Sequence, residues 1–152
     1  MSGLRSFSFI VYDDPKPWQR PRFSRKTGKF FTAKPDVDAR HYLRSEFLSI
    51  PEVLKEVFAG TWEPLGGPIR LTVTAWLRMP KLMAKKRQRT ALPTKRPDLD
   101  NYLKQVEDAL QKYAFKDDSQ IVTVEARKRY VTDLTGTRQV PCWEIQIDEI
   151  QE

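Results

Sequence analysis

The chain of 152 residues has little of three features that mark common protein classes: it holds one cysteine, one histidine and no long apolar run. Because Cys142 is the only cysteine, no disulfide can form within the chain, and a reducing, cytoplasmic setting is expected. No segment approaches the ~20 apolar residues of a transmembrane helix, and the first ten residues lack the apolar core of a signal peptide, so no membrane partner is expected. We interpret His41, which lies among residues of helical pattern, as structural.

Positive charge is abundant and unevenly distributed. Lys and Arg number 27 against 20 Asp and Glu, which gives a formal net charge of +7, and such a balance favours a polyanionic partner, most often nucleic acid. Residues 15–34 and 81–97 each hold seven basic residues and no acidic residue. A charge run alone is equally typical of a solvated loop. The aromatic residues interleaved in the first run, Trp18, Phe30 and Phe31 among them, favour a phosphate-binding surface, and their rings suit either base stacking or core packing. The DNA-binding residues predicted on the two runs are Arg20, Arg22, Arg25, Lys26, Lys85, Lys86, Arg87, Arg89, Lys95 and Arg96.

The pattern of apolar residues predicts one α+β domain that spans residues 1–152. Period-two alternation predicts strands near residues 7–11, 69–79, 122–126 and 143–147, and helical spacing predicts helices over residues 36–48, 51–60 and 99–113. Thr27-Gly28 is a possible hairpin turn. The order β, α, β, α, β, β then predicts a small mixed sheet of about four strands with helices packed on it.

Two acidic pairs flank the last predicted helix. Asp98 and Asp100 precede it, and Asp117 and Asp118 follow it. In an extended segment residues i and i+2 point the same way, so the first pair can present both carboxylates on one side. Either pair alone is more simply a helix cap or a turn, since aspartate favours both. Both pairs together, after a basic loop, favour a site for Mg²⁺ or Mn²⁺, which prefer hard oxygen ligands.

Lys104 lies four residues after Asp100 and outside the apolar stripe of the predicted helix. One interpretation is a surface ion-pair ladder with Asp100 and Asp108, worth a few tenths of a kcal/mol. The other is a fixed cation beside the metal, which stabilises negative charge on a reacting phosphate.

The stretches RPDLDNYLKQVEDAL and FKDDSQI, with PKPWQRPRFSRKTGKFF more weakly, resemble the RusA family of Holliday-junction resolvases. The resemblance implies a homodimeric, Mg²⁺-dependent endonuclease that uses no small-molecule cofactor and nicks opposed strands of a four-way DNA junction in recombination and repair. It implies Asp98, Asp100 and Asp118 as catalytic metal ligands, Asp117 as a helper and Lys104 as the essential lysine. In the better-known resolvase a basic residue directly precedes the first aspartate. Here Pro97 stands in that place, and Arg96 lies one residue earlier.

Three functions therefore compete at the level of sequence. The favoured one is a junction-selective endonuclease in which the metal activates a water for in-line attack on phosphorus and Lys104 offsets the charge that accumulates. The second is a non-catalytic DNA-binding protein that uses the same basic surface. The third is a nuclease of the same fold that acts on other branched or single-stranded DNA.

Overall fold

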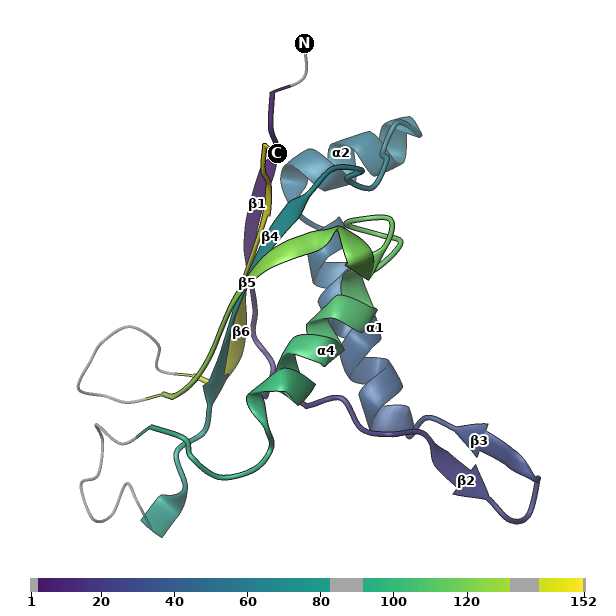
Figure 1. Cartoon of the computed structure of the whole chain (residues 1–152), viewed down its shortest axis with the longest axis vertical. Coiled ribbons are helices and arrows are strands. Elements are labelled where there is room, and N and C mark those ends of the chain that lie inside the picture. Colours follow the sequence, from purple (N-terminus) through teal and green to yellow (C-terminus); the bar gives the residue numbers. More distant parts are fainter. Residues whose placement is uncertain (1–2, 83–91, 132–139, 152) are drawn as a thin grey trace.

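A computed structural model describes residues 3–82, 92–131 and 140–151 of the chain as a mixed α+β domain (Figure 1). The strands are β1 (Ser6–Val11), β2 (Arg22–Ser24), β3 (Lys29–Phe31), β4 (Ile69–Leu77), β5 (Ile121–Tyr130) and β6 (Cys142–Glu149). The helices are α1 (Lys34–Leu48), α2 (Pro51–Ala59) and α4 (Leu99–Leu110), with a short 3₁₀ helix, η1 (Asp118–Gln120). Within these residues, no helix is both long enough and apolar enough to cross a membrane.

Four strands form one mixed sheet in the order β1-β6-β4-β5. β6 pairs antiparallel with both β1 and β4, while β4 and β5 run parallel, with a register shift between Ile69 and Arg70. The helices lie on one side of this sheet, and β5 forms one of its edges (Figure 1). The predicted fold class, the mixed four-stranded sheet and the element order are confirmed.

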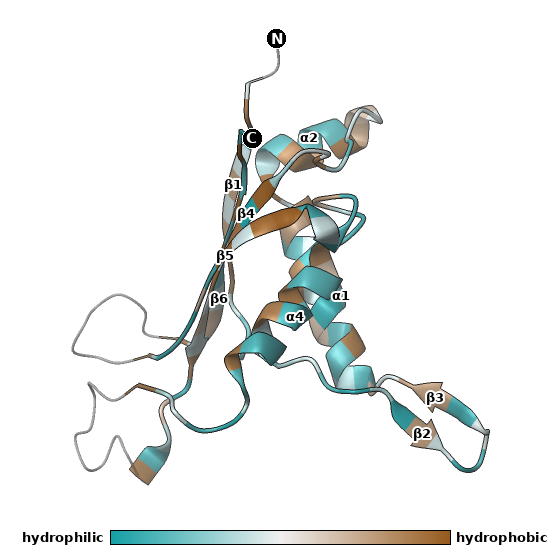
Figure 2. Cartoon of the chain, viewed as in Figure 1, coloured by the Kyte–Doolittle hydropathy of each residue, from teal (hydrophilic) through white to brown (hydrophobic). Residues whose placement is uncertain are grey.

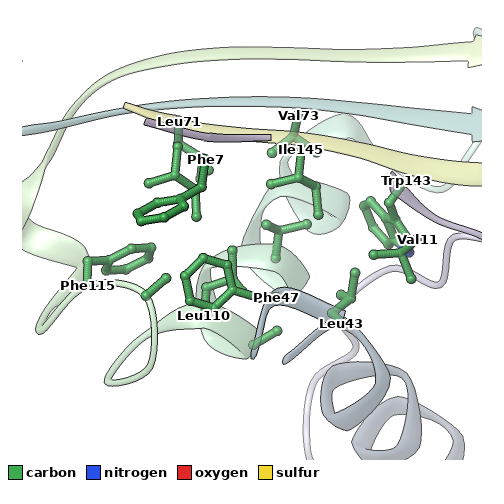
Figure 3. Close-up of a cluster of buried hydrophobic side chains, with 14 of the residues drawn as sticks. Phe7, Val11, Leu43, Phe47, Leu71, Val73, Leu110, Phe115, Trp143 and Ile145 are labelled. Carbon is green, nitrogen blue, oxygen red and sulfur yellow. The ribbon is translucent and has the colours of Figure 1, made fainter. Parts of the chain in front are cut away.

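The core lies between the sheet and the helices, as the alternation in the central strand dictates. In β4 the side chains of Ile69, Leu71, Val73 and Ala75 point inward and are buried. Apolar residues of α1 and α4 meet them, and apolar colour gathers where the helices face the sheet (Figures 2 and 3). The large buried side chains include Phe7, Leu43, Phe47, Val106, Leu110, Phe115, Trp143 and Ile145. This core fixes the direction of α4, whose two ends bear the acidic pairs.

The structure differs from the sequence-based expectations at three boundaries. The central strand ends at Leu77 rather than at Met79. α4 ends at Leu110, because Gln111 leaves the helical conformation and Lys112 adopts a positive φ of 73°. The segment before α1 contains a two-stranded sheet of its own, β2 and β3, which turns at the expected place, where Gly28 has a φ of 68°.

Candidate active site

The first acidic pair lies at the amino end of α4. Asp98 is the N-cap residue with extended backbone (φ −70°, ψ 148°), and Asp100 lies in the first turn. Both residues are exposed, and the Asp98 side chain makes no capping hydrogen bond. Asp98 therefore occupies the N-cap position without the side-chain hydrogen bond that a helix cap usually makes. Its carboxylate stays available to a ligand. The positive end of the helix dipole favours both negative charges here.

The backbone that leads to Asp98 is held by a lysine of the sheet. Lys128 of β5 donates hydrogen bonds from Nζ to the carbonyl oxygens of Lys95 and Pro97, at 2.8 and 2.9 Å. These two hydrogen bonds connect the edge strand β5 to the basic segment that leads into α4. Sequence reasoning missed Lys128, because a lysine in a run of basic residues on an edge strand carries no signal of its own.

If the protein cleaves DNA, as the resemblance in its sequence predicts, replacing Lys128 with methionine is expected to lower the cleavage rate about tenfold, since the loss of charge-assisted hydrogen bonds frees the segment that leads to Asp98. The midpoint of thermal unfolding should stay nearly unchanged. Single-turnover cleavage and thermal melts measure the two quantities, with Lys55→Met on exposed α2 as the matched control. Equal rates for the two variants would show that Lys128 does not position the site.

The Lys104 side chain contacts Trp18, which lies in the segment before the β2–β3 hairpin. Its Nζ lies 3.7 Å from the centre of the Trp18 ring, and the Trp18 backbone N–H donates to the carbonyl of Asn101 at 2.9 Å. Trp18 is half-buried and lies outside the cluster of buried core side chains. The cation–π contact keeps the ammonium on the exposed side of the helix, one turn from Asp100.

The second acidic pair lies where the chain enters η1 and β5. Asp117 caps η1: its carboxylate accepts the Ser119 N–H at 2.9 Å, and its own N–H donates to Gln120 Oε1 at 2.8 Å. Gln120 Nε2 also donates to the carbonyls of Leu65 and Gly67, both at 2.9 Å. Asp117 thus serves the turn, as the simpler interpretation of this pair expects, while the Asp118 side chain stays exposed.

The titration of these carboxyls follows from their contacts. The Ser119 backbone N–H lowers the pKa of Asp117, while the hydrogen bond that Asp118 shares with Asp117 raises the pKa of Asp118. Burial raises the pKa of Glu107 in α4, and the charges of Asp118 and Asp108 raise it further. The positive charge of Lys104 acts in the opposite sense and lowers the pKa of Glu107.

One chain keeps the two acidic pairs apart. They flank a helix of twelve residues, which spans about 18 Å at 1.5 Å per residue, and β5 begins near the end of α4 and runs back toward its start (Figure 1). Within the described segments, no three His, Cys, Asp or Glu side chains lie close enough to hold one metal ion. The structure thus places Asp98 and Asp100 at the start of α4 and Lys104 near its middle, and it leaves Asp117 and Asp118 beyond the far end of the helix.

The predicted DNA-binding residues fall into three groups. Arg20, Arg22, Arg25 and Lys26 are exposed on and before the β2–β3 hairpin. Lys95 and Arg96 are exposed directly before the first acidic pair. Lys85, Lys86, Arg87 and Arg89 lie outside the residues that the structure describes.

An α+β domain with exposed carboxylates, an adjacent lysine and a basic hairpin has the features of an enzyme that acts on a polyanion. The family model for endodeoxyribonuclease RusA matches residues 14–138, which is most of the chain. The protein therefore belongs to the RusA family of endodeoxyribonucleases. It is also similar to the uncharacterized protein YqaN of Bacillus subtilis (strain 168), with 33% identity over 129 residues that cover 80% of this chain and 86% of that protein.

Proposed function

We propose that the protein is a Holliday-junction resolvase, which makes paired, symmetric nicks in four-way DNA junctions during recombination and repair in the cytoplasm. Family membership supports this proposal. The structural observation that carries it is the arrangement in the first half of α4, where the exposed carboxylates of Asp98 and Asp100 precede Lys104, with Asp100 one turn before it. Mg²⁺ is the proposed cofactor, and Mn²⁺ is a possible substitute.

The donor set at the start of α4 fits a hard cation, and the third proposed ligand lies elsewhere in the chain. Carboxylate oxygens suit Mg²⁺, which is usually held by one or two carboxylates together with water and substrate phosphate. Asp98 and Asp100 supply two carboxylates. The third proposed ligand, Asp118, follows the far end of the same helix. A second copy of the chain can supply it.

The open edge of β5 offers the surface for such a dimer. β5 is an edge strand of ten residues, and its Val122 and Val124 are 61% and 41% exposed. An open apolar edge is a template for strand pairing. If two β5 strands pair antiparallel about Thr123, Val122 of each copy lies opposite Val124 of the other.

The same pairing brings the separated ligands together. In such a pairing Asp118 of the second copy, in η1 directly before its β5, lies toward Lys128 of the first, because η1 precedes the start of one strand and Lys128 lies near the end of the other. Lys128 holds the backbone directly before Asp98. A two-fold dimer built this way therefore has two equal sites, each with Asp98 and Asp100 from one copy and Asp118 from the other.

In this site each group has a distinct task. Asp98, Asp100 and Asp118 would hold the metal, which when bound supplies Lewis-acid stabilisation of the phosphoryl oxygens and lowers the pKa of a water. Lys104 places a positive charge where negative charge accumulates on the phosphate. Trp18 holds the Lys104 ammonium in place. The exposed basic residues bind flanking phosphates, so affinity falls steeply as salt rises.

Cleavage of a labelled four-way junction tests this function. In Mg²⁺ we expect symmetric nicks in opposed strands, no cleavage of a linear duplex of matched sequence, and no cleavage of either in EDTA. Tight junction binding without cleavage in Mg²⁺ or Mn²⁺ would indicate the non-catalytic DNA-binding protein instead. Faster cleavage of flaps, forks or single strands than of junctions would indicate the nuclease with another substrate.

A further inference from the structure

The β2–β3 hairpin is an arm that projects from the domain. Its two strands and the turn between them, residues 22–31, extend from the segment before α1, away from the main sheet (Figure 1). Phe23 and Phe30 lie opposite each other across the two strands, with ring centres 5.3 Å apart and an angle of 60° between the rings. We call residues 22–31 the aromatic arm.

The aromatic rings of the arm face solvent in a single chain. Phe30 is 73% exposed, Phe23 is 55% exposed and Phe31 is 47% exposed. A hairpin of two three-residue strands is marginally stable in water without a surface to pack on. Three exposed phenylalanines on ten residues therefore indicate that the arm is completed by something it binds.

The charge of the arm selects the kind of partner. Arg22, Arg25, Lys26 and Lys29 surround the rings, and all four are exposed. Residues 15–34 contain no acidic residue. Two such arms from two copies of the chain would repel each other, whereas a polyanion with flat apolar faces complements both the charges and the rings. Nucleic acid with unpaired or unstacked bases has both properties, since every base offers a flat ring face and every phosphate a negative charge.

We propose that the aromatic arm stacks on bases exposed at the branch point of DNA, while its basic residues bind the phosphates on either side. Phe23 and Phe30 then act as the stacking pair, and Arg25 and Lys26 in the turn act as phosphate contacts. A linear duplex keeps its bases stacked and offers the rings nothing, so the arm discriminates branched DNA from linear DNA. This inference rests on the proposed junction substrate but not on cleavage, because it concerns binding alone.

Binding measured in EDTA, where cleavage is not expected, tests the role of the arm. The probe is a four-way junction with 2-aminopurine beside the branch point, and a linear duplex of matched sequence is the control. For Phe23→Leu/Phe30→Leu we expect junction affinity to fall about tenfold and duplex affinity to change less than about twofold. The change in 2-aminopurine fluorescence that binding of the wild type causes should be lost. For Arg25→Gln/Lys26→Gln we expect both affinities to fall together, with a salt dependence shallower by about two phosphate contacts.

Three outcomes would overturn the proposal. The first is equal loss of junction and duplex affinity in the leucine variant, and the second is no loss at all. The third is a change in the molar mass of the assembly of the leucine variant relative to the wild type, measured by light scattering, which would assign the rings to a contact between protein chains. Phe30→Trp, which keeps an aromatic face, should retain junction affinity and the 2-aminopurine signal, so a misfolded arm in the leucine variant is recognised. A wild-type protein that shows the signal but never cleaves would refute the nuclease function and leave the role of the arm intact.

Discussion

Replacing Asp100 with asparagine is expected to lower the rate of junction cleavage in Mg²⁺ at least about a thousandfold, while junction affinity stays within about twofold. The substitution keeps the size and shape of the side chain but removes the charge that a hard cation requires. Asp100 is exposed in the first turn of α4, so its replacement leaves the core intact. Single-turnover cleavage and junction binding in EDTA give the two quantities.

The matched control for this experiment is Asp38→Asn, an exposed aspartate of α1 that lies outside the proposed site. It makes the same change of charge in a helix of the same domain. Cleavage by the Asp38 variant should equal that of the wild type. A comparable rate for Asp100→Asn would remove Asp100 from the site, and equal losses in both variants would point to a general effect of charge on DNA binding.

A dimer made from one Asp100→Asn chain and one Asp118→Asn chain is expected to regain the cleavage that each variant alone has lost. In the proposed arrangement one of its two sites carries both substitutions, and the other carries neither. Because a single intact site cuts a single strand, the mixed dimer should convert a supercoiled plasmid with an extruded cruciform into nicked circles. The wild type should produce linear plasmid from paired cuts. Two different affinity tags on co-expressed chains isolate the mixed dimer.

A second mixed dimer, the reciprocal one, is the control, and it is expected to be inactive where the first is active. It joins a wild-type chain to a chain with both Asp100→Asn and Asp118→Asn, so each of its sites contains one substitution. It should be inactive if each site draws on both copies, and active if each site lies within one chain. Activity of the reciprocal dimer together with inactivity of the first would therefore exclude the shared site, while the family activity would stand.

The main architecture was predictable because its signals are local. Buried residues alternate along β4 and recur at helical spacing along α4, and each pattern predicts both the type of element and the face that is buried. The order of the elements along the chain then predicts the α+β class. The hairpin strands were missed because three residues are too few for alternation to appear, and prolines precede them. In that segment only the turn at Gly28 could be predicted from the sequence.

The places of the predicted site residues in the fold were predictable in part, and whether they form a site stays a prediction. The helical spacing of the segment predicts that Lys104 lies one turn after Asp100, and the structure places Asp98 and Asp100 at the start of α4 and Lys104 near its middle. The position of Asp118 depends on how the chain returns after Leu110, and the proposed dimer depends on contacts between copies, and local spacing along the sequence predicts neither. Lys128 donates its hydrogen bonds to backbone carbonyls. Because every residue has such a carbonyl, the sequence contains no pattern that predicts this contact.

The contact between Trp18 and α4 has a kinetic consequence. Trp18 lies four residues before the aromatic arm, bonds to Asn101 and supports the Lys104 ammonium. In the proposed mechanism, a ligand that orders the arm would therefore also restrict Lys104, the side chain proposed to face the reacting phosphate. Binding energy gained far from the scissile bond can in this way be used to lower the barrier rather than to tighten the complex. A DNA that cannot engage the arm would then turn over slowly even at saturation, and selectivity for branched substrates would reside in kcat as well as in KM.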